Sequence, residues 1–395
     1  MSKLKRSLKI SLYLALVSCL LLACAITSRI SPHERQPTPI KTMTPEATQQ
    51  ELFSLPAPLY YLQDGQIWRL DPDAQTIHQV TSEDAVVEAF DISPMDGSLV
   101  YISNNSLVIS DPDGGNREIL LAGAELPPLL DELTLLNEMD YITSAMRSPY
   151  WSEDGQKIAF INNGLLVYDL EKNQVEPILT YTNNLNEQTL LADLFSWSSD
   201  GQYFLVSQYA YPIESLHQIE LGLFRPDNYL YNLSESYSVT FTWNPETTLL
   251  ILANAAYGSP QSLQVCELAN MECTLIAEFE PARWYYHYAH PFVTAEDKLF
   301  VFMGTTDDGS QIPDTFKLIS LHLDGSNRQN LRNDGYSLAT ALWSPNGDGI
   351  VVVLADETGN FPTGSMVWLA VTDAPPVSLP VMLADNLRWD LSNSQ

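Results

Sequence analysis

The stretch Trp343-Ser-Pro-Asn-Gly347, followed by the apolar run Ile350-Val-Val-Val353, decides the fold of this chain because the same phrase recurs along it. It returns as Trp151-Ser-Glu-Asp-Gly155 and as Trp197-Ser-Ser-Asp-Gly201, each time ahead of β-branched or aromatic residues. In such a phrase Pro pre-sets a turn φ, Asp hydrogen-bonds its own backbone and Gly adopts a positive φ at no steric cost. Each copy therefore predicts a strand, a tight turn and a second strand.

A further copy starts at Ile92, degenerate copies start at Trp243 and Val293, and a closing copy starts at Trp389. From Trp151 onward, successive copies are 46, 46, 50, 50 and 46 residues apart. This spacing accommodates four short strands with their connections, which is one blade of a β-propeller. The sequence therefore predicts an all-β propeller of seven blades, or of six if one weak copy is not a blade.

The two ends of the predicted propeller each supply only part of a blade. Residues 387–393 contain the Trp389 strand, and residues 59–70 have the pattern of later strands in a blade that lacks its first strand. We therefore expect the two parts to share one blade, with the Trp389 strand innermost, so that the ring closes within residues 58–395.

The phrase Trp-Ser-x-Asp-Gly, with turns such as Asp111-Pro-Asp-Gly-Gly-Asn116 and Leu323-Asp-Gly-Ser-Asn-Arg328, resembles the TolB-type, WD-like propeller repeat of bacteria. The resemblance extends over residues 58–395 and implies the propeller fold. TolB also has a separate N-terminal α/β domain, where this chain has only a tether-like segment, so a TolB role is not implied. The repeat also occurs in propellers of prolyl-oligopeptidase-like enzymes, whose hydrolase domain has no counterpart here.

The N-terminal residues are typical of an export signal over residues 1–23, because basic residues precede an unbroken apolar run from Ile10 to Leu22. Leu21-Leu22-Ala23-Cys24 resembles a bacterial lipobox, which implies a lipidated Cys24; the alternative is an ordinary signal peptide that ends near a cysteine. Residues 24–57 are rich in Ser, Thr, Pro and Gln, as in an extended tether. We expect a lipid-anchored protein on the extracytoplasmic side of the cell envelope, in the periplasm or at the cell surface.

Two cysteines, Cys266 and Cys273, remain after Cys19 of the signal and Cys24. The six residues between them fit a hairpin that holds the pair on opposite strands. In an exported protein this pattern predicts a disulfide, with two reduced buried thiols as the alternative. No nearby His or Cys completes a metal ligand set.

The formal net charge is −30, and it becomes −34 without the four cationic residues of the signal. Nucleic-acid binding depends on basic patches, so this charge excludes nucleic acid as a partner. It also disfavours anionic lipid surfaces, so we expect membrane contact through the N-terminal lipid only. The charge is consistent with a soluble, monomeric folded body.

Catalytic motifs are absent from the sequence. It contains no Gly-x-Ser-x-Gly elbow, no His-Glu-x-x-His, no phosphate loop and no dinucleotide glycine pattern. The Asp-Gly turns lack the spacing of calcium loops. His287 and His290, with Asp307 and Asp308, form only a low-specificity metal or acid–base pattern. We therefore expect no catalytic residue, no metal and no cofactor.

The connections of a propeller alternate between two faces, and here the long ones fall on one face. With the strands of a blade called a to d from the inside outward, the a–b and c–d turns are short. The longer connections join b to c, or d to the next a, at residues 121–146, 208–216, 255–261, 278–291, 304–315 and 356–364. Loops on a rigid scaffold carry binding sites, so we expect the ligand on this loop-rich face.

One of these connections is rich in aromatic residues. Its candidate ligand-binding residues are Trp284, Tyr285, Tyr286, His287, Tyr288 and His290. If exposed, they could stack on a sugar or grip a peptide; if buried, they would only pack blade against blade. Further candidates on the same face are Tyr209, Tyr211, Tyr257 and Phe361.

The segment Pro127–Asp140 has Leu residues at near-helical spacing and predicts a short helix, either a lid or docking element or a structural support. The leading functional hypothesis is a binding or scaffold module for an envelope protein or glycan. The alternatives are a hydrolase or lyase acting on sugars or peptides at the central channel, and a purely structural envelope component.

Overall fold

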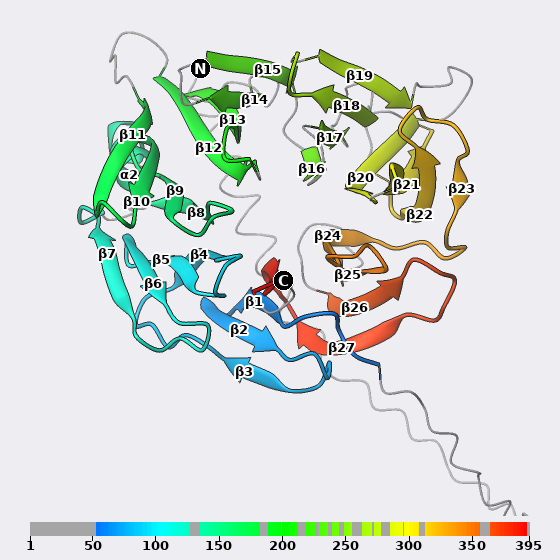
Figure 1. Ribbon diagram of the computed structural model, residues 1–395, viewed down its shortest axis with the longest axis horizontal. Helices are drawn as coiled ribbons and strands as arrows, with labels where there is room; N and C mark the ends of the chain where they lie inside the picture. The colour runs from blue at the N-terminus through cyan, green and yellow to red at the C-terminus, as the bar shows by residue number, and fades with distance from the viewer. Residues whose placement is uncertain are drawn as a thin grey trace, which may run out of the picture. The chain divides into compact units, whose positions relative to one another are not determined.

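Seven four-stranded antiparallel sheets follow one another around a ring (Figure 1). We number these sheets blades 1 to 7 and keep the letters a to d for the strands of each blade. The seven-bladed propeller is thus confirmed, and the weak copies of the phrase at Trp243 and Val293 each belong to a complete blade.

The computed structural model describes the chain in fourteen ranges. They are residues 53–126, 135–181, 189–198, 200–211, 219–225, 229–235, 239–244, 249–254, 263–270, 272–277, 285–294, 296–307, 313–355 and 364–392. The chain divides into two compact units, Met1–Glu51 and Leu52–Gln395, and all described residues belong to the second. The predicted signal, Cys24 and most of the tether lie outside the described residues. No helix in the described part has the length and apolar character needed to span a membrane.

Blades 1 to 3 have the shortest b–c turns of the ring. Blade 1 consists of β28 (Asp385–Trp389), β1 (Leu59–Gln63), β2 (Gln66–Leu70) and β3 (Ile77–Gln79). Blade 2 consists of β4 (Val87–Ile92), β5 (Leu99–Ser103), β6 (Ser106–Ser110) and β7 (Glu118–Ala122). Blade 3 consists of β8 (Arg147–Trp151), β9 (Lys157–Ile161), β10 (Gly164–Asp169) and β11 (Gln174–Thr180), and helix α2 (Leu135–Ser144) precedes it. In each of these blades only two residues separate strand b from strand c.

In blades 4 to 7, seven to ten residues separate strand b from strand c. Blade 4 consists of β12 (Thr189–Trp197), β13 (Phe204–Tyr211), β14 (Ile219–Arg225) and β15 (Tyr229–Glu235). Blade 5 consists of β16 (Val239–Trp243), β17 (Leu249–Asn254), β18 (Leu263–Glu267) and β19 (Glu272–Ala277). Blade 6 consists of β20 (Tyr285–Val293), β21 (Lys298–Thr306), β22 (Lys317–His322) and β23 (Gln329–Asn330). Blade 7 consists of β24 (Leu338–Trp343), β25 (Gly349–Leu354), β26 (Ser365–Ala370) and β27 (Val377–Met382).

The serine of the recurring phrase closes the a–b turn. The Ser152 hydroxyl donates to Asp154 Oδ1 at 2.6 Å and accepts the Lys157 N–H at 2.9 Å. Gly155 has a φ of +64° and donates its N–H to the Ser152 carbonyl. Ser198 makes the same contact with Asp200 at 2.6 Å. The polar residues of the phrase are therefore satisfied within the turn, which explains why Ser can be buried there.

The tryptophans of the phrase link neighbouring blades. Trp389 Nε1 donates to the Trp343 carbonyl at 2.6 Å, and Trp343 Nε1 donates to the His290 carbonyl at 2.8 Å. Trp243 Nε1 donates to Ser196 Oγ at 2.9 Å. In each case the acceptor lies on the innermost strand of the preceding blade. Apolar clusters of described residues fill all seven interfaces between neighbouring blades, so burial holds the ring together.

Blade 1 contains strands from both ends of the described chain. β28 pairs antiparallel with β1, with Trp389 opposite Leu59 and Arg388 opposite Tyr60. The Asp390 N–H extends this pairing by donating to the Pro58 carbonyl at 3.0 Å. The innermost strand of blade 1 is therefore the last strand of the chain, as Figure 1 shows near the C-terminus.

Several predicted connections are shorter than expected because their ends belong to strands. Residues 208–211 lie in β13, residues 285–291 in β20 and residues 304–306 in β21. The helix expected over Pro127–Asp140 overlaps α2, which runs over Leu135–Ser144; residues 127–134 lie outside the described residues. Strand pairing across each blade extended these segments beyond what local turn signals indicated.

Candidate binding site

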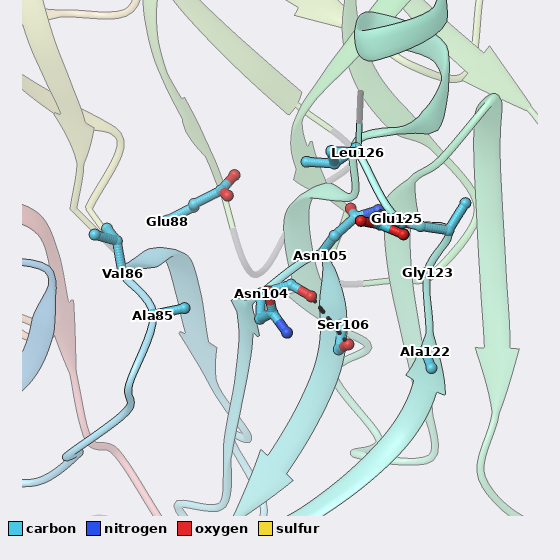
Figure 2. Close-up of a pocket in the computed structure, with 11 residues that line it drawn as sticks. Ala85, Val86, Glu88, Asn104, Asn105, Ser106, Ala122, Gly123, Glu125 and Leu126 are labelled. Atoms are coloured by element: carbon cyan, nitrogen blue, oxygen red, sulfur yellow. Dashed lines mark hydrogen bonds between the residues drawn. The ribbon is translucent and has the colours of Figure 1, made fainter. Parts of the chain in front are cut away.

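A pocket of about 580 Å³ lies at blade 2 on the loop-rich face (Figure 2). Three chain segments meet there: the link from blade 1 into β4, the b–c turn of blade 2, and the chain after β7. The lining residues are Ala85, Val86, Glu88, Asn104, Asn105, Ser106, Ala122, Gly123, Ala124, Glu125 and Leu126. Pockets of about 300–1,000 Å³ are typical of small-ligand sites.

Asn105 holds two walls of this pocket together. Its side-chain amide donates to the carbonyls of Ala124 at 2.7 Å and Ser144 at 3.1 Å, and its Oδ1 accepts the Met146 N–H at 2.7 Å. Asn105 has a φ of +50°, as a two-residue hairpin turn requires. A Cβ on Gly123 would lie 2.3 Å from the Asn105 carbonyl oxygen, so only glycine allows this close approach. The pocket therefore has a rigid frame.

The C-terminal turn of α2 is attached to the propeller beside this frame. Asn162 Nδ2 donates to the Ser144 carbonyl at 2.9 Å, and the Asn163 N–H donates to the Thr143 carbonyl at 2.8 Å. Ile142 packs against the apolar cluster between blades 3 and 4. These contacts favour the structural alternative over the lid for this turn of the helix.

Glu88 is one of the two carboxylates, with Glu125, that line this pocket. It lies on β4, its carboxylate is exposed, and it makes no side-chain hydrogen bond within the described part of the chain. Partial burial by the surrounding walls raises the pKa of Glu88 above its usual value, and the charge of Arg147 opposes this effect. Figure 2 shows the carboxylate projecting from β4 into the space bounded by the lining residues.

Three ionisable side chains on the innermost strands of blades 1 to 3, Arg388, Asp91 and Tyr150, contact one another. Arg388 Nε donates to Asp91 Oδ1 at 2.9 Å, and Asp91 Oδ2 accepts the Trp151 N–H at 2.8 Å. The Arg388 guanidinium also lies 5.6 Å from the centre of the Tyr150 ring. Burial raises the pKa of Asp91, while Arg388 and the Trp151 N–H lower it. This network joins three consecutive blades.

A second ion pair joins blades 3 and 4. Arg147 Nη2 lies 2.8 Å from Asp193 Oδ1, and Arg147 Nη1 donates to the Ile142 carbonyl at 3.1 Å. Glu88, Arg147 and Asp193 each stand four residues before the aromatic or apolar residue that ends strand a. The equivalent residues of blades 5 to 7 are Val239, Ala289 and Ala339. Charge on the innermost strands is therefore confined to one side of the ring.

None of the aromatic candidates that the structure describes lines this pocket. Trp284, Tyr257 and Phe361 lie outside the described residues. Tyr209 and Tyr211 lie in β13, where a connection was expected. The remaining candidates, Tyr285, Tyr286, His287, Tyr288 and His290, all lie in β20.

The side chains of His287 and Tyr288 are 0% and 2% exposed, which favours the alternative in which these residues pack blade against blade. Alternation along β20 places Tyr288 in the cluster between blades 5 and 6, with the half-buried Tyr286 packed against it. His287 Nε2 lies 3.0 Å from Thr306 Oγ1, and burial lowers the pKa of His287 to about 4. Tyr285, which is 38% exposed, remains a candidate contact.

His290 has a backbone role at the joint between blades. Its φ is +51°, its N–H donates to Thr240 Oγ1 of blade 5 at 2.7 Å, and its carbonyl accepts Trp343 Nε1 of blade 7. The residue therefore links three blades through its main chain, which gives its position a structural explanation.

The sequence contained one signal for the pocket that the interpretation did not use. The dipeptide Asn104-Asn105 between two apolar runs is typical of a tight hairpin turn, and a long connection starts close behind it at residue 123. A short turn next to a long connection leaves a concave region on the surface. Recognising the pocket also required knowing that Glu88 lies beside this region.

Cys266 and Cys273 lie opposite each other in β18 and β19 and are joined by a disulfide. Among the described residues, no three His, Cys, Asp or Glu side chains are grouped so that they could hold a metal ion.

No protein-family model and no curated protein sequence matches this chain. Among solved structures, the oligogalacturonate lyase of Vibrio parahaemolyticus aligns with a TM-score of 0.52 at 10% identity, covering 82% of this chain and 83% of the lyase. A puromycin hydrolase aligns with a TM-score of 0.51 at 13% identity, covering 85% of this chain but 55% of the hydrolase. TolB from Acinetobacter baumannii aligns with a TM-score of 0.42 at 13% identity, covering 84% of this chain and 81% of TolB. At these identities, the likeness to the lyase and the hydrolase shows a shared fold alone.

Proposed function

We propose that this seven-bladed propeller is a binding module that recognises an envelope protein or glycan through its loop-rich face, at the pocket of blade 2. The observation that carries the proposal is the contrast between Glu88 and its ionisable neighbours. Glu88 presents an exposed carboxylate without a hydrogen bond in the described residues, whereas Asp91 and Arg147 are held in ion pairs. Orienting polar groups around a preformed concavity are what recognition of a ligand requires.

A hydrolase or lyase is the second candidate, because the raised pKa of Glu88 suits a general acid. The described lining residues supply no nucleophile hydrogen-bonded to a base, which is the arrangement that covalent catalysis needs. An anionic sugar such as the oligogalacturonate named for the lyase would meet two carboxylates, Glu88 and Glu125. We therefore favour binding over catalysis.

We place this module outside the cytoplasm, attached to a membrane by lipid on Cys24. The lipobox resemblance of residues 21–24 supports the anchor. The disulfide between Cys266 and Cys273 supports the compartment, because such bonds persist in oxidising environments.

Obstructing the pocket rim tests the proposed function. Val86 is 62% exposed at the rim, so a Val86→Cys variant can carry a bulky maleimide after the native disulfide has formed. A Glu153→Cys variant carries the same group on an a–b turn, which belongs to the opposite face. Each labelled protein is crosslinked to envelope extracts, and the captured proteins and glycans are identified by mass spectrometry and glycan analysis. One defined species should be missing from the protein labelled at Val86 and present with the protein labelled at Glu153. Equal capture by both labelled proteins would remove this face from consideration.

A further inference from the structure

We infer that the pocket of blade 2 takes a lysine or arginine side chain of a partner polypeptide. This inference rests on the proposed binding function and specifies the chemistry of its ligand.

The charges that line the pocket have one sign. Glu88 and Glu125 are the ionisable side chains among its described lining residues, and both are carboxylates. Arg147, whose charge acts on Glu88, is itself held by Asp193 and by the Ile142 carbonyl, so it is committed to the joint between blades 3 and 4. Glu88 has no hydrogen-bonded partner among the described residues, and a ligand cation would supply one in a charge-assisted contact.

The uncharged walls of the pocket match an aliphatic stem. Ala85, Val86, Ala122, Ala124 and Leu126 contribute small or branched aliphatic surface, and no aromatic ring occurs among the described lining residues. Lysine and arginine bury their methylene stems along such surface while their cationic heads reach polar groups. Sugar rings, in contrast, bind preferentially against flat aromatic faces. The lining therefore favours a polypeptide side chain over a glycan.

The remaining polar groups suit the head of such a side chain. The side chain of Asn105 is already hydrogen-bonded to the backbone of Ala124 and Met146, but Asn104 and Ser106 lie next to it and also line the pocket. The formal charge of −30 on the whole chain adds a long-range attraction for basic partners, which raises association rates at low ionic strength.

Peptide binding by the whole protein tests this inference. The probes are fluorescent, N-acetylated nonapeptides of Gly and Ser that differ only at the central residue: Arg, Lys, citrulline or norleucine. Anisotropy at low salt should show the Arg and Lys peptides binding about tenfold more tightly than their neutral counterparts, since one charge-assisted contact is worth that much. Glu88→Gln should abolish the discrimination. Glu171→Gln, which removes one exposed carboxylate from the turn between β10 and β11, should preserve it.

Three results would overturn the inference: no binding of any peptide, equal binding of the Arg and citrulline peptides, or unchanged discrimination by Glu88→Gln. Tight binding of an amino-sugar oligomer without peptide binding would assign the pocket to a glycan instead. The maleimide label on Val86→Cys distinguishes failure of the binding function from failure of the lysine or arginine assignment. If the Val86 label blocks capture while the peptides show no charge discrimination, the binding function stands and only the lysine or arginine assignment fails.

Discussion

Blades 1 to 3 and blades 5 to 7 are built on the same turn phrase but are held together differently. In blades 1 to 3, the residue before the end of strand a is Arg388, Asp91 or Tyr150, and these three contact one another. In blades 5 to 7, the equivalent residues are Thr242, Phe292 and Leu342. There the innermost contacts are aromatic, as in the stacking of Phe292 on Trp343 with ring centres 5.2 Å apart.

The b–c turns also differ between the two groups of blades. The b–c turns of blades 1 to 3 are two residues long, whereas those of blades 5 to 7 span eight to ten residues. A propeller can tolerate either arrangement because apolar packing at every blade interface supplies most of the stability. Blades 1 to 3 therefore combine charged residues on their innermost strands with short b–c turns, and the pocket lies at blade 2. Buried ion pairs add specificity of packing more readily than net stability.

Asp91→Ala is the strongest way to break this comparison. It would leave the half-buried Arg388 without its partner and should lower the free energy of unfolding by about 3 kcal/mol. Thr242→Ala, at the equivalent position of blade 5, should cost less than about 1 kcal/mol. Urea denaturation of both variants measures the two values. Equal losses would show that the charged network has no special place in the ring.

The pH dependence of stability tests blade 6, in which His287 is buried. Its pKa is lowered by burial to about 4, so the unfolded state binds the proton first as the pH falls. Stability should therefore be lost between about pH 7 and pH 4, by about 3 kcal/mol from this residue. His287→Gln should show a flatter dependence over that range. Parallel curves for the two proteins would mean that His287 is not held neutral by the fold.

Removal of the disulfide in blade 5 should have a smaller effect. The double variant Cys266→Ser, Cys273→Ser opens a short loop, and the chain-entropy estimate for such a loop is about 2 kcal/mol. Thermal unfolding of the variant beside the parent measures the loss. An unchanged melting temperature would indicate that blade 5 depends on packing alone.

Glu88→Gln should change stability least, by less than about 0.5 kcal/mol, because the side chain is exposed and makes no hydrogen bond within the described residues. Urea denaturation is again the measurement. A loss above about 1 kcal/mol would place Glu88 with Asp91 among the structural charges. The distinction on which the pocket assignment depends would then disappear.

The blade number followed from the sequence because turn chemistry is local: Ser, Asp and Gly satisfy one another within six residues, and their spacing counts the blades. The aromatic run left two alternatives open, exposed or buried, because the neighbours of residues 285–290, not their composition, decide their burial. β20 is a strand whose two sides face blades 5 and 7, so Tyr288 and His287 are both enclosed. A strand and an exposed connection can share the same residues until pairing with β21 is known.

The sequence by itself therefore determined the architecture, the cysteine pair placed on adjacent strands, and the strands at the two ends that meet in blade 1. Only the tertiary structure decided which ionisable side chains are paired and which line a pocket. Asp91 and Arg388 are 297 residues apart in sequence, and the pocket assembles three segments from residues 85–88, 104–106 and 122–126. Ring closure brings Asp91 and Arg388 together, whereas the strands of blade 2 and their links assemble the pocket. Burial and pairing then distinguish these paired charges from the exposed carboxylate of Glu88.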